Sequence, residues 1–393
     1  MNAHPPAMPA NRYPTTPAVD AGPLPDPFLN ADGTRVKKRS EWPARADAWR
    51  DLIVTTEYGG MPPHPERVVC DQLCAAGVRR WPSNPRLYSH RVRCEGGAEP
   101  FAFVVRTLVP QGAGPFPVVL NGDGCWWYIS DDIAQRVVES GYALMMFNRT
   151  EMVEDRPSAD DRSDPRRSGG LYDAYPGRSF GAIAAWAWGY HRCVDAICEL
   201  GDELSLDPGR IGVTGHSRGG KTVLVAAATD RRITLVNDNA SGAGGAAVMR
   251  YVGEGGETLG ILNHFPSWFG PQPGLRPYIG READAPFDQH CLLATIAPRP
   301  LLLTYAIDDR WSNPEGMVQS ATAAREVYRF LGAPDNLAYH LRPGEHLHAS
   351  EDWETLIDFL GVHWGGCAPS VVYNEHPYHH LRPAFGWSAP TAR

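Results

Sequence analysis

Three kinds of segment are missing from this sequence of 393 residues, and each absence excludes a class of protein. No apolar stretch approaches the ~18 uninterrupted residues of a membrane-spanning helix, so we expect no membrane partner. Lys and Arg form no run and the formal net charge is −8, so we expect no nucleic-acid partner. The first residues hold no basic segment followed by an apolar one. This favours a cytoplasmic protein, or a secreted or periplasmic one if a leader has been trimmed.

Cysteine and histidine are present without the spacing of a metal site. The eight cysteines are scattered, at positions 70, 74, 94, 125, 193, 198, 291 and 367, and no two close pairs match a zinc-ribbon pattern. For the three histidines of the stretch 374–383, a metal site would need fixed geometry and usually another ligand, so surface packing is the expectation. We therefore expect reduced cysteines, no bound metal and no cofactor.

Segments of strand and helix character alternate along the chain, which predicts an α/β protein with a mainly parallel sheet covered on both faces. Strands are expected at 86–96, 101–110, 116–124, 140–150, 210–215, 232–240, 298–309 and 336–346. Helices are expected at 40–59, 180–200, 219–229, 315–332 and 350–364. The first of these helices begins at Ser40, a residue type favoured as an N-cap.

A serine lies between two glycines where a predicted strand passes into a helix. The stretch Gly215-His216-Ser217-Arg218-Gly219 matches the pattern G-x-S-x-G. Side chains at either flank of such a sharp turn would collide with neighbouring backbone, and the turn presents the serine above the sheet edge. Free N–H groups at the start of the helix stabilise an oxyanion that forms there. We predict that Ser217 is a nucleophile in an α/β-hydrolase fold, a three-layer sandwich, with a plain glycine turn as the alternative.

A serine nucleophile needs a base, and in this fold the acid and then the histidine follow it along the chain. His346 lies in the loop after the last predicted strand and is the predicted base, with His348 as its competitor. Asp309 ends the preceding apolar strand and is the predicted acid, because a carboxylate there can orient the imidazole. Asp308 and Asp238 are the alternatives.

Other parts of the chain carry a resemblance to a known family. They read, in order, LPDPFLNADGTRVKKRSEWPARADAWRDLI, GRSFGAIAAWAWGYHRCVDAI, VTGHSRGGK, SGAGGAA, DQHCLLATIAPRPLLL, DDRWSNPEG and RPGEHLHASEDW. Over about residues 23–365 these segments resemble those of the glucuronoyl esterases, carbohydrate esterase family 15. Members of that family are α/β-hydrolases that cleave esters between 4-O-methyl-glucuronic acid on xylan and lignin alcohols. The resemblance implies a serine carboxylic-ester hydrolase that acts on uronate esters through an acyl-enzyme.

The resemblance also implies roles for individual residues. Arg218 would help to stabilise the oxyanion with its side chain and backbone N–H. Lys221 would contact sugar hydroxyls, unless it is only a solvated helix position. Glu257 resembles a sugar-binding position, and Trp311 a tryptophan that lines the sugar site, with core packing as its alternative.

The chain departs from the family pattern in two places. Many members carry the catalytic acid where this chain has Ala240, so the resemblance to some bacterial relatives, which use an Asp after the next strand, favours Asp309. Fungal members join two cysteines beside the serine and the histidine, and His216 and Leu347 stand at those positions here. The missing disulfide fits a reducing compartment. His216 is interpreted as a packing residue behind the nucleophile.

Two loops are candidates for the walls of the site. One of Trp126 and Trp127 could line a pocket, and the charged segment 147–173 could border it or be a solvated loop. We expect an extended or disordered arm over 1–25, one catalytic domain over 26–365 and a wrapping tail over 366–393. Two alternatives to the uronate esterase stay open: an intracellular esterase for another carbohydrate or aromatic ester, and a catalytically silent scaffold that binds a carbohydrate or a partner.

Overall fold

The computed structural model describes residues 17–126, 129–156 and 167–391. Within these residues the centre of the molecule is a nine-stranded sheet of order β11-β10-β8-β7-β5-β6-β4-β3-β2. Its strands are β2 (Arg67–Gly77), β3 (Arg86–Glu95), β4 (Phe101–Val109), β5 (Phe116–Asn121), β6 (Ala143–Phe147), β7 (Leu206–His216), β8 (Leu235–Asn239), β10 (Leu301–Ala306) and β11 (Leu337–Arg342). The strands from β11 to β6 in this order pair in parallel, and β6, β4, β3 and β2 pair antiparallel. The mainly parallel sheet predicted from the alternation of strands and helices is confirmed.

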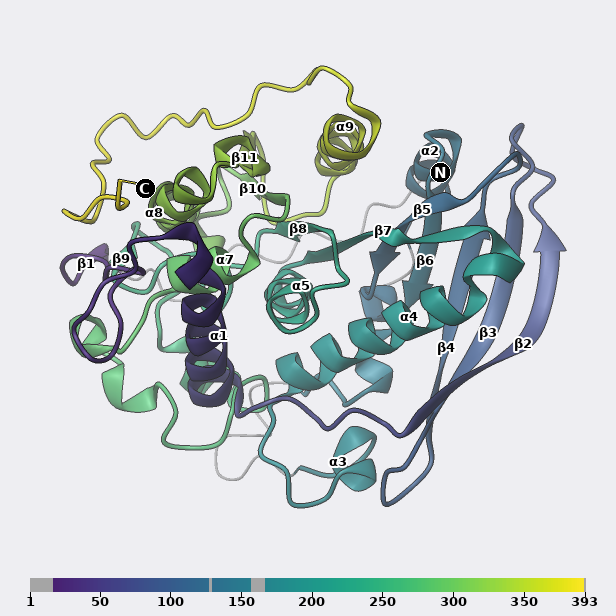
Figure 1. Ribbon diagram of the computed structural model, residues 1–393, viewed down its shortest axis with the longest axis horizontal. Coiled ribbons are helices and arrows are strands. Elements are labelled where there is room, and N and C mark those ends of the chain that lie inside the picture. Colours follow the sequence, from purple (N-terminus) through teal and green to yellow (C-terminus); the bar gives the residue numbers. More distant parts are fainter. Residues whose placement is uncertain (1–16, 127–128, 157–166, 392–393) are drawn as a thin grey trace.

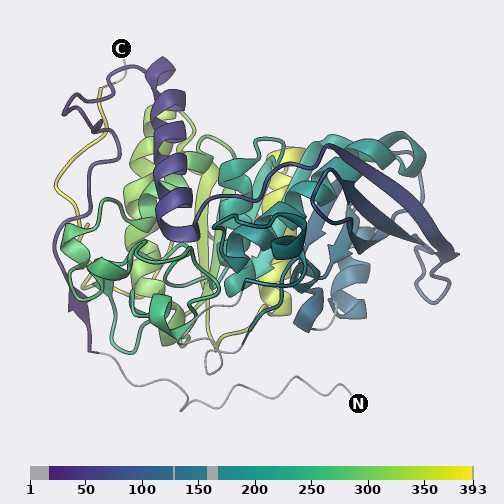
Figure 2. The same cartoon turned by 90° about the horizontal axis from the view of Figure 1, so that it is seen from below.

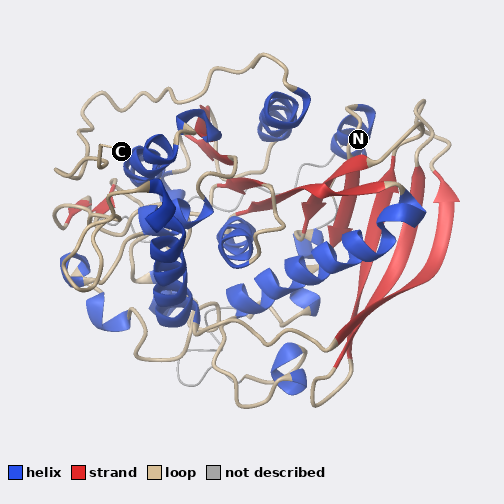
Figure 3. Cartoon of the chain, in the orientation of Figure 1, coloured by secondary structure: helices blue, strands red, loops and turns tan. Residues whose placement is uncertain are grey.

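Helices cover both faces of this sheet and complete a three-layer α/β-hydrolase fold (Figures 1 and 3). They are α1 (Trp42–Tyr58), α2 (Asp131–Glu139), α3 (Leu171–Ala174), α4 (Ala182–Leu204), α5 (Arg218–Thr229), α6 (Ile261–His264), α7 (Gln289–Ile296), α8 (Pro314–Leu331) and α9 (Ser350–Gly365). Side chains of α1, α4, α5, α7 and α8 share one hydrophobic core with one face of the sheet. Those of α2 and α9 share a second core with the other face. No helix of the described residues is long and apolar enough to cross a membrane.

The central strands are buried on both faces, as parallel strands between two helical layers are, and most of their residues are apolar. All five residues of β6, Ala-Leu-Met-Met-Phe, are buried, and so are all six of β10. Helix α4 lies across the sheet (Figure 1). It is alanine-rich and has buried residues on most of its faces.

The register brings the carboxyl ends of the parallel strands to one edge of the sheet. Thr214 of β7 pairs with Asn121 of β5, and His216 of β7 pairs with Asn239 of β8. Asn239 in turn pairs with Thr304 of β10. In an open α/β sheet ligands bind at this edge. The loops that follow β5, β7, β10 and β11 therefore meet where the serine turn lies.

Two details of the sequence prediction are wrong. The first helix was expected to begin at Ser40, but Arg39–Glu41 form a 3₁₀ turn and α1 begins at Trp42, with Pro43 in its first turn. Pro is well tolerated there because it lacks the N–H that a first-turn residue leaves unpaired. Strand β2 and helices α2 and α7 were not predicted. Strand β2 is an edge strand with mostly exposed residues, so its sequence carries no buried apolar pattern.

The chain after α9 runs along the outside of the β10–β11 end of the molecule (Figures 1 and 2). Asn374 meets the free edge of β11: its N–H donates to the Tyr339 carbonyl at 2.8 Å, and its Oδ1 accepts from the Tyr339 N–H at 3.1 Å. Further on, the Trp387 Nε1–H donates to the Leu24 carbonyl at 2.9 Å. Residues Val19–Asp20 (β1) pair with Tyr251–Val252 (β9), so part of the predicted N-terminal arm is a short strand. Residues 1–16 of that arm lie outside the described residues.

Candidate active site

The serine turn has the geometry of a strained strand-to-helix elbow. Strand β7 ends at His216 and α5 begins at Arg218, and Ser217 between them has φ 56° and ψ −121°. A positive φ is costly for a residue with a side chain and persists only where the surroundings enforce it. Here the Ser217 N–H donates to the Asn239 carbonyl at 2.7 Å, and its own carbonyl accepts from the Lys221 N–H at 3.1 Å. The elbow thus holds a partly exposed serine at the start of a helix.

The glycines around the serine are needed because neighbouring atoms leave no room for a side chain. A Cβ on Gly215 would lie 2.4 Å from the Gly219 carbonyl oxygen. A Cβ on Gly219 would lie 2.2 Å from Asp123 Oδ1. The steric reason given for the G-x-S-x-G pattern is therefore visible at both of its glycines.

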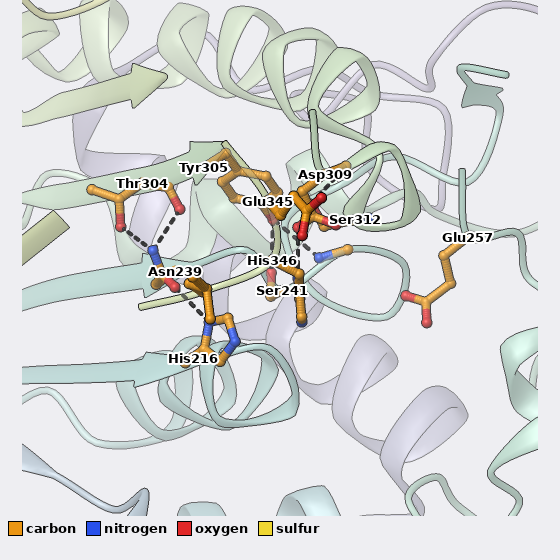
Figure 4. Close-up of polar contacts among 12 residues, drawn as sticks. His216, Asn239, Ser241, Glu257, Thr304, Tyr305, Asp309, Ser312, Glu345 and His346 are labelled. Atoms are coloured by element: carbon orange, nitrogen blue, oxygen red, sulfur yellow. Dashed lines mark hydrogen bonds and ion pairs between the residues drawn. The ribbon is translucent and has the colours of Figure 1, made fainter. Parts of the chain in front are cut away.

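His346 and Asp309 face one another from the loops after β11 and β10 (Figure 4). The His346 Nδ1 atom lies 2.6 Å from Asp309 Oδ2, and Asp309 is 4% exposed. Because a carboxylate can only accept, Nδ1 carries the proton and Nε2 has a free lone pair. The His346 ring centroid is 4.5 Å from that of His216, the residue before the serine, so the imidazole lies at the elbow.

The other candidate acids are engaged elsewhere. Asp308 Oδ2 accepts from the Gly344 N–H at 2.9 Å and so fixes the loop that carries the histidine. Asp238 is buried on β8, where its Oδ2 accepts from Ser241 Oγ at 2.9 Å and from the Tyr305 hydroxyl at 3.3 Å. Burial raises the pKa of Asp238 to about 7. Of the three candidates, Asp309 is the carboxylate that contacts His346.

A row of histidine rings packs behind the predicted base. The ring centroid of His216 is 4.5 Å from that of His346 and 6.0 Å from that of His348, and His348 stacks on Trp353 at 4.7 Å. Burial lowers the pKa of His348 to about 3. Burial and the two neighbouring histidines lower the pKa of His216 well below its usual range. Both rings are neutral, so they pack beside His346 without a charge of their own.

The elbow is tied to the neighbouring strands by groups that the sequence analysis missed. Asn239 Oδ1 lies 2.5 Å from His216 Nδ1, while its Nδ2 donates to Thr304. In the loop after β5, Asp123 Oδ2 accepts from the His216 N–H at 2.7 Å, and its Oδ1 pairs with the fully buried Arg149. The run "NGDG" after a predicted strand is a turn signal that could have drawn attention to Asp123.

The guanidinium of Arg218 lies among aromatic rings next to the serine. Its Cζ atom is 4.3 Å from the ring centroid of Trp268 and 5.2 Å from that of Trp126. Its Nη1 donates to Asp155 at 2.8 Å. Asp155 belongs to the predicted bordering segment 147–173, of which residues 157–166 are outside the described residues, as is Trp127.

The structure brings together Lys221, Glu257 and Trp311. Lys221 and Glu257 form a buried ion pair. Lys221 Nζ donates to the Ser241 and Ala243 carbonyls, both at 2.5 Å, and to Glu257 Oε2 at 3.0 Å. The Glu257 N–H donates to the Trp311 carbonyl at 2.8 Å. The alternative that Lys221 is a solvated helix position is wrong, because its side chain is 3% exposed. Sugar binding by these three residues stays a prediction.

Over residues 17–126, 129–156 and 167–391, no three His, Cys, Asp or Glu side chains gather so that they could hold a metal ion. What the elbow offers chemically is a serine at a helix N-terminus beside a histidine that a buried aspartate orients. On a mainly parallel sheet, these features define a serine hydrolase of the α/β-hydrolase class.

Comparison with known proteins narrows that class to a family. A family model described as glucuronyl esterase of fungi matches residues 92–332. A 4-O-methyl-glucuronoyl methylesterase of Thermothelomyces thermophilus is 30% identical over 97% of this chain and 91% of its own length. The chain spans 64% of the length of a further methylesterase, from Podospora anserina, which is also 30% identical. The chain therefore belongs to the glucuronyl esterase family and is a carboxylic ester hydrolase.

Solved structures agree with this assignment. A carbohydrate esterase family 15 glucuronoyl esterase from Caldicellulosiruptor kristjansonii superposes with a TM-score of 0.78 at 30% identity, over 93% of this chain and 97% of that one. A serine-to-alanine mutant of the glucuronoyl esterase from Sporotrichum thermophile, in complex with methyl 4-O-methyl-β-D-glucopyranuronate, superposes with a TM-score of 0.73 at 28% identity. The match covers 92% of each chain.

Proposed function

We propose that this protein hydrolyses esters of 4-O-methyl-glucuronate and that Ser217, His346 and Asp309 carry the reaction. The observation that carries this proposal is the 2.6 Å contact between Asp309 and His346 beside the serine elbow, in a chain of the glucuronyl esterase family. The related methylesterase names and the glucuronate ester complex support the substrate class.

In the proposed mechanism, Ser217 Oγ attacks the ester carbonyl while His346 Nε2 takes its proton. Asp309 holds the Nδ1–H of His346 and stabilises the imidazolium that forms. The negative charge on the former carbonyl oxygen is held by the Arg218 N–H at the start of α5, together with the Arg218 guanidinium. When the tetrahedral intermediate collapses, His346 gives its proton to the alcohol that leaves.

A water molecule then completes the cycle. His346 takes a proton from the water, whose oxygen attacks the acyl-enzyme, and Ser217 leaves as the proton returns to its Oγ. The product is a free uronate, which is negatively charged. Because the ester carries no such charge, the cationic group next to the elbow is matched to the intermediate and the product rather than to the substrate.

We propose that Lys221 and Glu257 form the floor of the sugar site. Glu257 Oε2 accepts from both Lys221 and the Ala243 N–H, at 3.0 and 2.9 Å. Its Oε1 atom makes no hydrogen bond within the described part of the chain, so it is the oxygen that we assign to a sugar hydroxyl. Lys221 holds this carboxylate in place, and its charge opposes the burial that raises the pKa of Glu257.

The test is a comparison of esters with matched variants. Wild-type protein and Ser217→Ala are assayed on methyl 4-O-methyl-glucuronate, on its benzyl ester and on p-nitrophenyl acetate, with circular dichroism to verify the fold. We expect hydrolysis of the glucuronate esters by the wild type and at least a 10³-fold loss in Ser217→Ala. Preference for p-nitrophenyl acetate would support an esterase of another substrate class. Folded protein that is inactive, and that a serine-directed phosphonate does not label, would support a silent scaffold.

A further inference from the structure

The guanidinium of Arg218 is held by a carboxylate from a distant loop. Asp155, between β6 and α3, accepts from Arg218 Nη1 through Oδ2 at 2.8 Å. Its second oxygen, Oδ1, accepts from the Trp268 Nε1–H at 2.9 Å. We propose that Asp155 is a positioning residue that sets the Arg218 guanidinium beside the nucleophile; this inference rests on the proposed function.

Both partners of this ion pair are shielded from water. The side chains of Arg218 and Asp155 are 21% and 13% exposed. A charge-assisted hydrogen bond in such surroundings is screened less than one at the surface, so it fixes direction as well as distance. Because Asp155 also accepts from Trp268, it holds the guanidinium and the indole in one arrangement.

Aromatic rings restrict the guanidinium from its other sides. Trp268 lies 4.3 Å from the Arg218 Cζ atom and stacks on Phe265 with ring centroids 3.8 Å apart and planes 3° from parallel. Trp126, at 5.2 Å, belongs to the loop after β5. A guanidinium over aromatic faces is attracted by their electron density, which keeps it near the rings but gives its N–H groups no fixed direction.

One donor of Arg218 is left without a protein partner. The Nε atom is buried, and within the described residues it makes no hydrogen bond. A buried N–H without a partner is costly, so the ion pair with Asp155 is needed to hold the side chain in this arrangement.

The role of Asp155 follows from the difference between a fixed and a mobile donor. A donor that is already aimed at the position of the oxyanion needs no reorganisation in the transition state. Without Asp155, Arg218 keeps its charge but samples other rotamers, so it is aimed correctly for only part of the time. We expect this to lower kcat about 10- to 100-fold and to leave KM nearly unchanged, since removal of a whole oxyanion donor costs about 10²- to 10³-fold.

The test is a double-mutant cycle on the full-length protein. Asp155→Asn, Arg218→Met and the double variant are compared for kcat and KM, and Glu154→Gln is the matched control. Glu154 precedes Asp155 and has a side chain that is 74% exposed, and it pairs with Arg156 rather than Arg218. Thermal melting of each variant separates a loss of fold from a loss of rate.

We expect Asp155→Asn to lower kcat about 10- to 100-fold when Arg218 is present and less than twofold when it is Met. Glu154→Gln should keep kcat within twofold of the wild type. Equal losses from Asp155→Asn in both backgrounds, or a kcat equal to that of Glu154→Gln, would overturn the inference.

The cycle is run on methyl 4-O-methyl-glucuronate and, in parallel, on p-nitrophenyl acetate. If the wild type hydrolyses only the acetate, the proposed substrate is wrong, but the positioning role is still decided by the acetate rates. If neither ester is hydrolysed, the rate at which a phosphonate labels Ser217 takes the place of kcat in the cycle. If Ser217 is not labelled either, the proposed function and this inference both fail.

Discussion

Replacement of Asp309 by Asn is the sharpest test of the proposed catalytic residues. Asp309 is nearly the same size as Asn and is buried, so the change alters charge and hydrogen bonding with little change in packing. At the 2.6 Å contact, the Asn amide can present its NH₂ group to His346 Nδ1, which then becomes the acceptor. Nε2 would carry the proton instead and could not accept the proton of Ser217.

The magnitude follows from the tautomer that the carboxylate enforces. The same change in a Ser-His-Asp triad lowers kcat about 10⁴-fold because the wrong tautomer is held. Asp309 also accepts from the Ser312 N–H at 3.4 Å, a bond that Asn can keep, so the loop should stay in place. We expect a loss in kcat of about 10³- to 10⁴-fold, equal to ~4 to 5.5 kcal/mol of activation free energy, with KM changed less than threefold.

The assay measures kcat and KM on methyl 4-O-methyl-glucuronate between pH 6 and 9, with Asp308→Asn as the matched control. Asp308 is the adjacent residue of the same type, but its partner is the Gly344 N–H, and an Asn oxygen can accept that bond. Asp308→Asn should keep kcat within about fivefold. Retention of more than a tenth of the activity by folded Asp309→Asn, or an equal loss in Asp308→Asn, would refute the assignment.

Three further changes test other parts of the site. Gly219→Ala would place a Cβ 2.2 Å from Asp123 Oδ1, so we expect a large fall in melting temperature and in activity; a wild-type melting curve would contradict this. Lys221→Met would leave the Glu257 carboxylate buried without its cation, and we expect about 3–5 kcal/mol less free energy of unfolding in urea, partly restored by adding Glu257→Gln. Because burial raises the pKa of Asp238 from 3.8 to about 7, the folded protein keeps this proton longer than the unfolded chain. The free energy of unfolding should therefore fall as pH rises from about 4 to 7, by on the order of 4 kcal/mol from this group, and Asp238→Asn should remove that part of the fall; parallel stability curves for the two proteins would count against it.

The parts of the fold that the sequence predicts well are those with a strong local pattern. Strand β6 is a continuous apolar run, β10 is apolar except for Thr304, and α4 is a long alanine-rich stretch, so each is recognisable without any neighbour. Strand β2 is different, because its edge position leaves most residues exposed and its stability comes from pairing with β3. Such pairing is a long-range contact that no local pattern records.

The site divides in the same way. Ser217, His346 and Asp309 could be proposed because the elbow has a sequence pattern and its partners follow in a known chain order. Asp155 and Asn239 could not, because their contacts with Arg218 and His216 join segments 63 and 23 positions apart. Lys221 looked like a possible surface residue because its three acceptors come from parts of the chain 20 or more positions away.

The contact of Asn374 with the free edge of β11 has a consequence for how the enzyme would fail under stress. Among the residues that the structure describes, β11 pairs with the single strand β10, and the loop that carries His346 follows it directly. Asn374 supplies to Tyr339 the pair of hydrogen bonds that a further strand would otherwise provide, and it blocks that edge to other chains. The edge strand β11 is thus the strand that positions His346, the predicted base. If this edge opened, hydrolysis would stop while the core around α4 and β6 stayed folded. The rate of heat inactivation should then depend on the contacts of Asn374 with Tyr339 more than on the stability of the core.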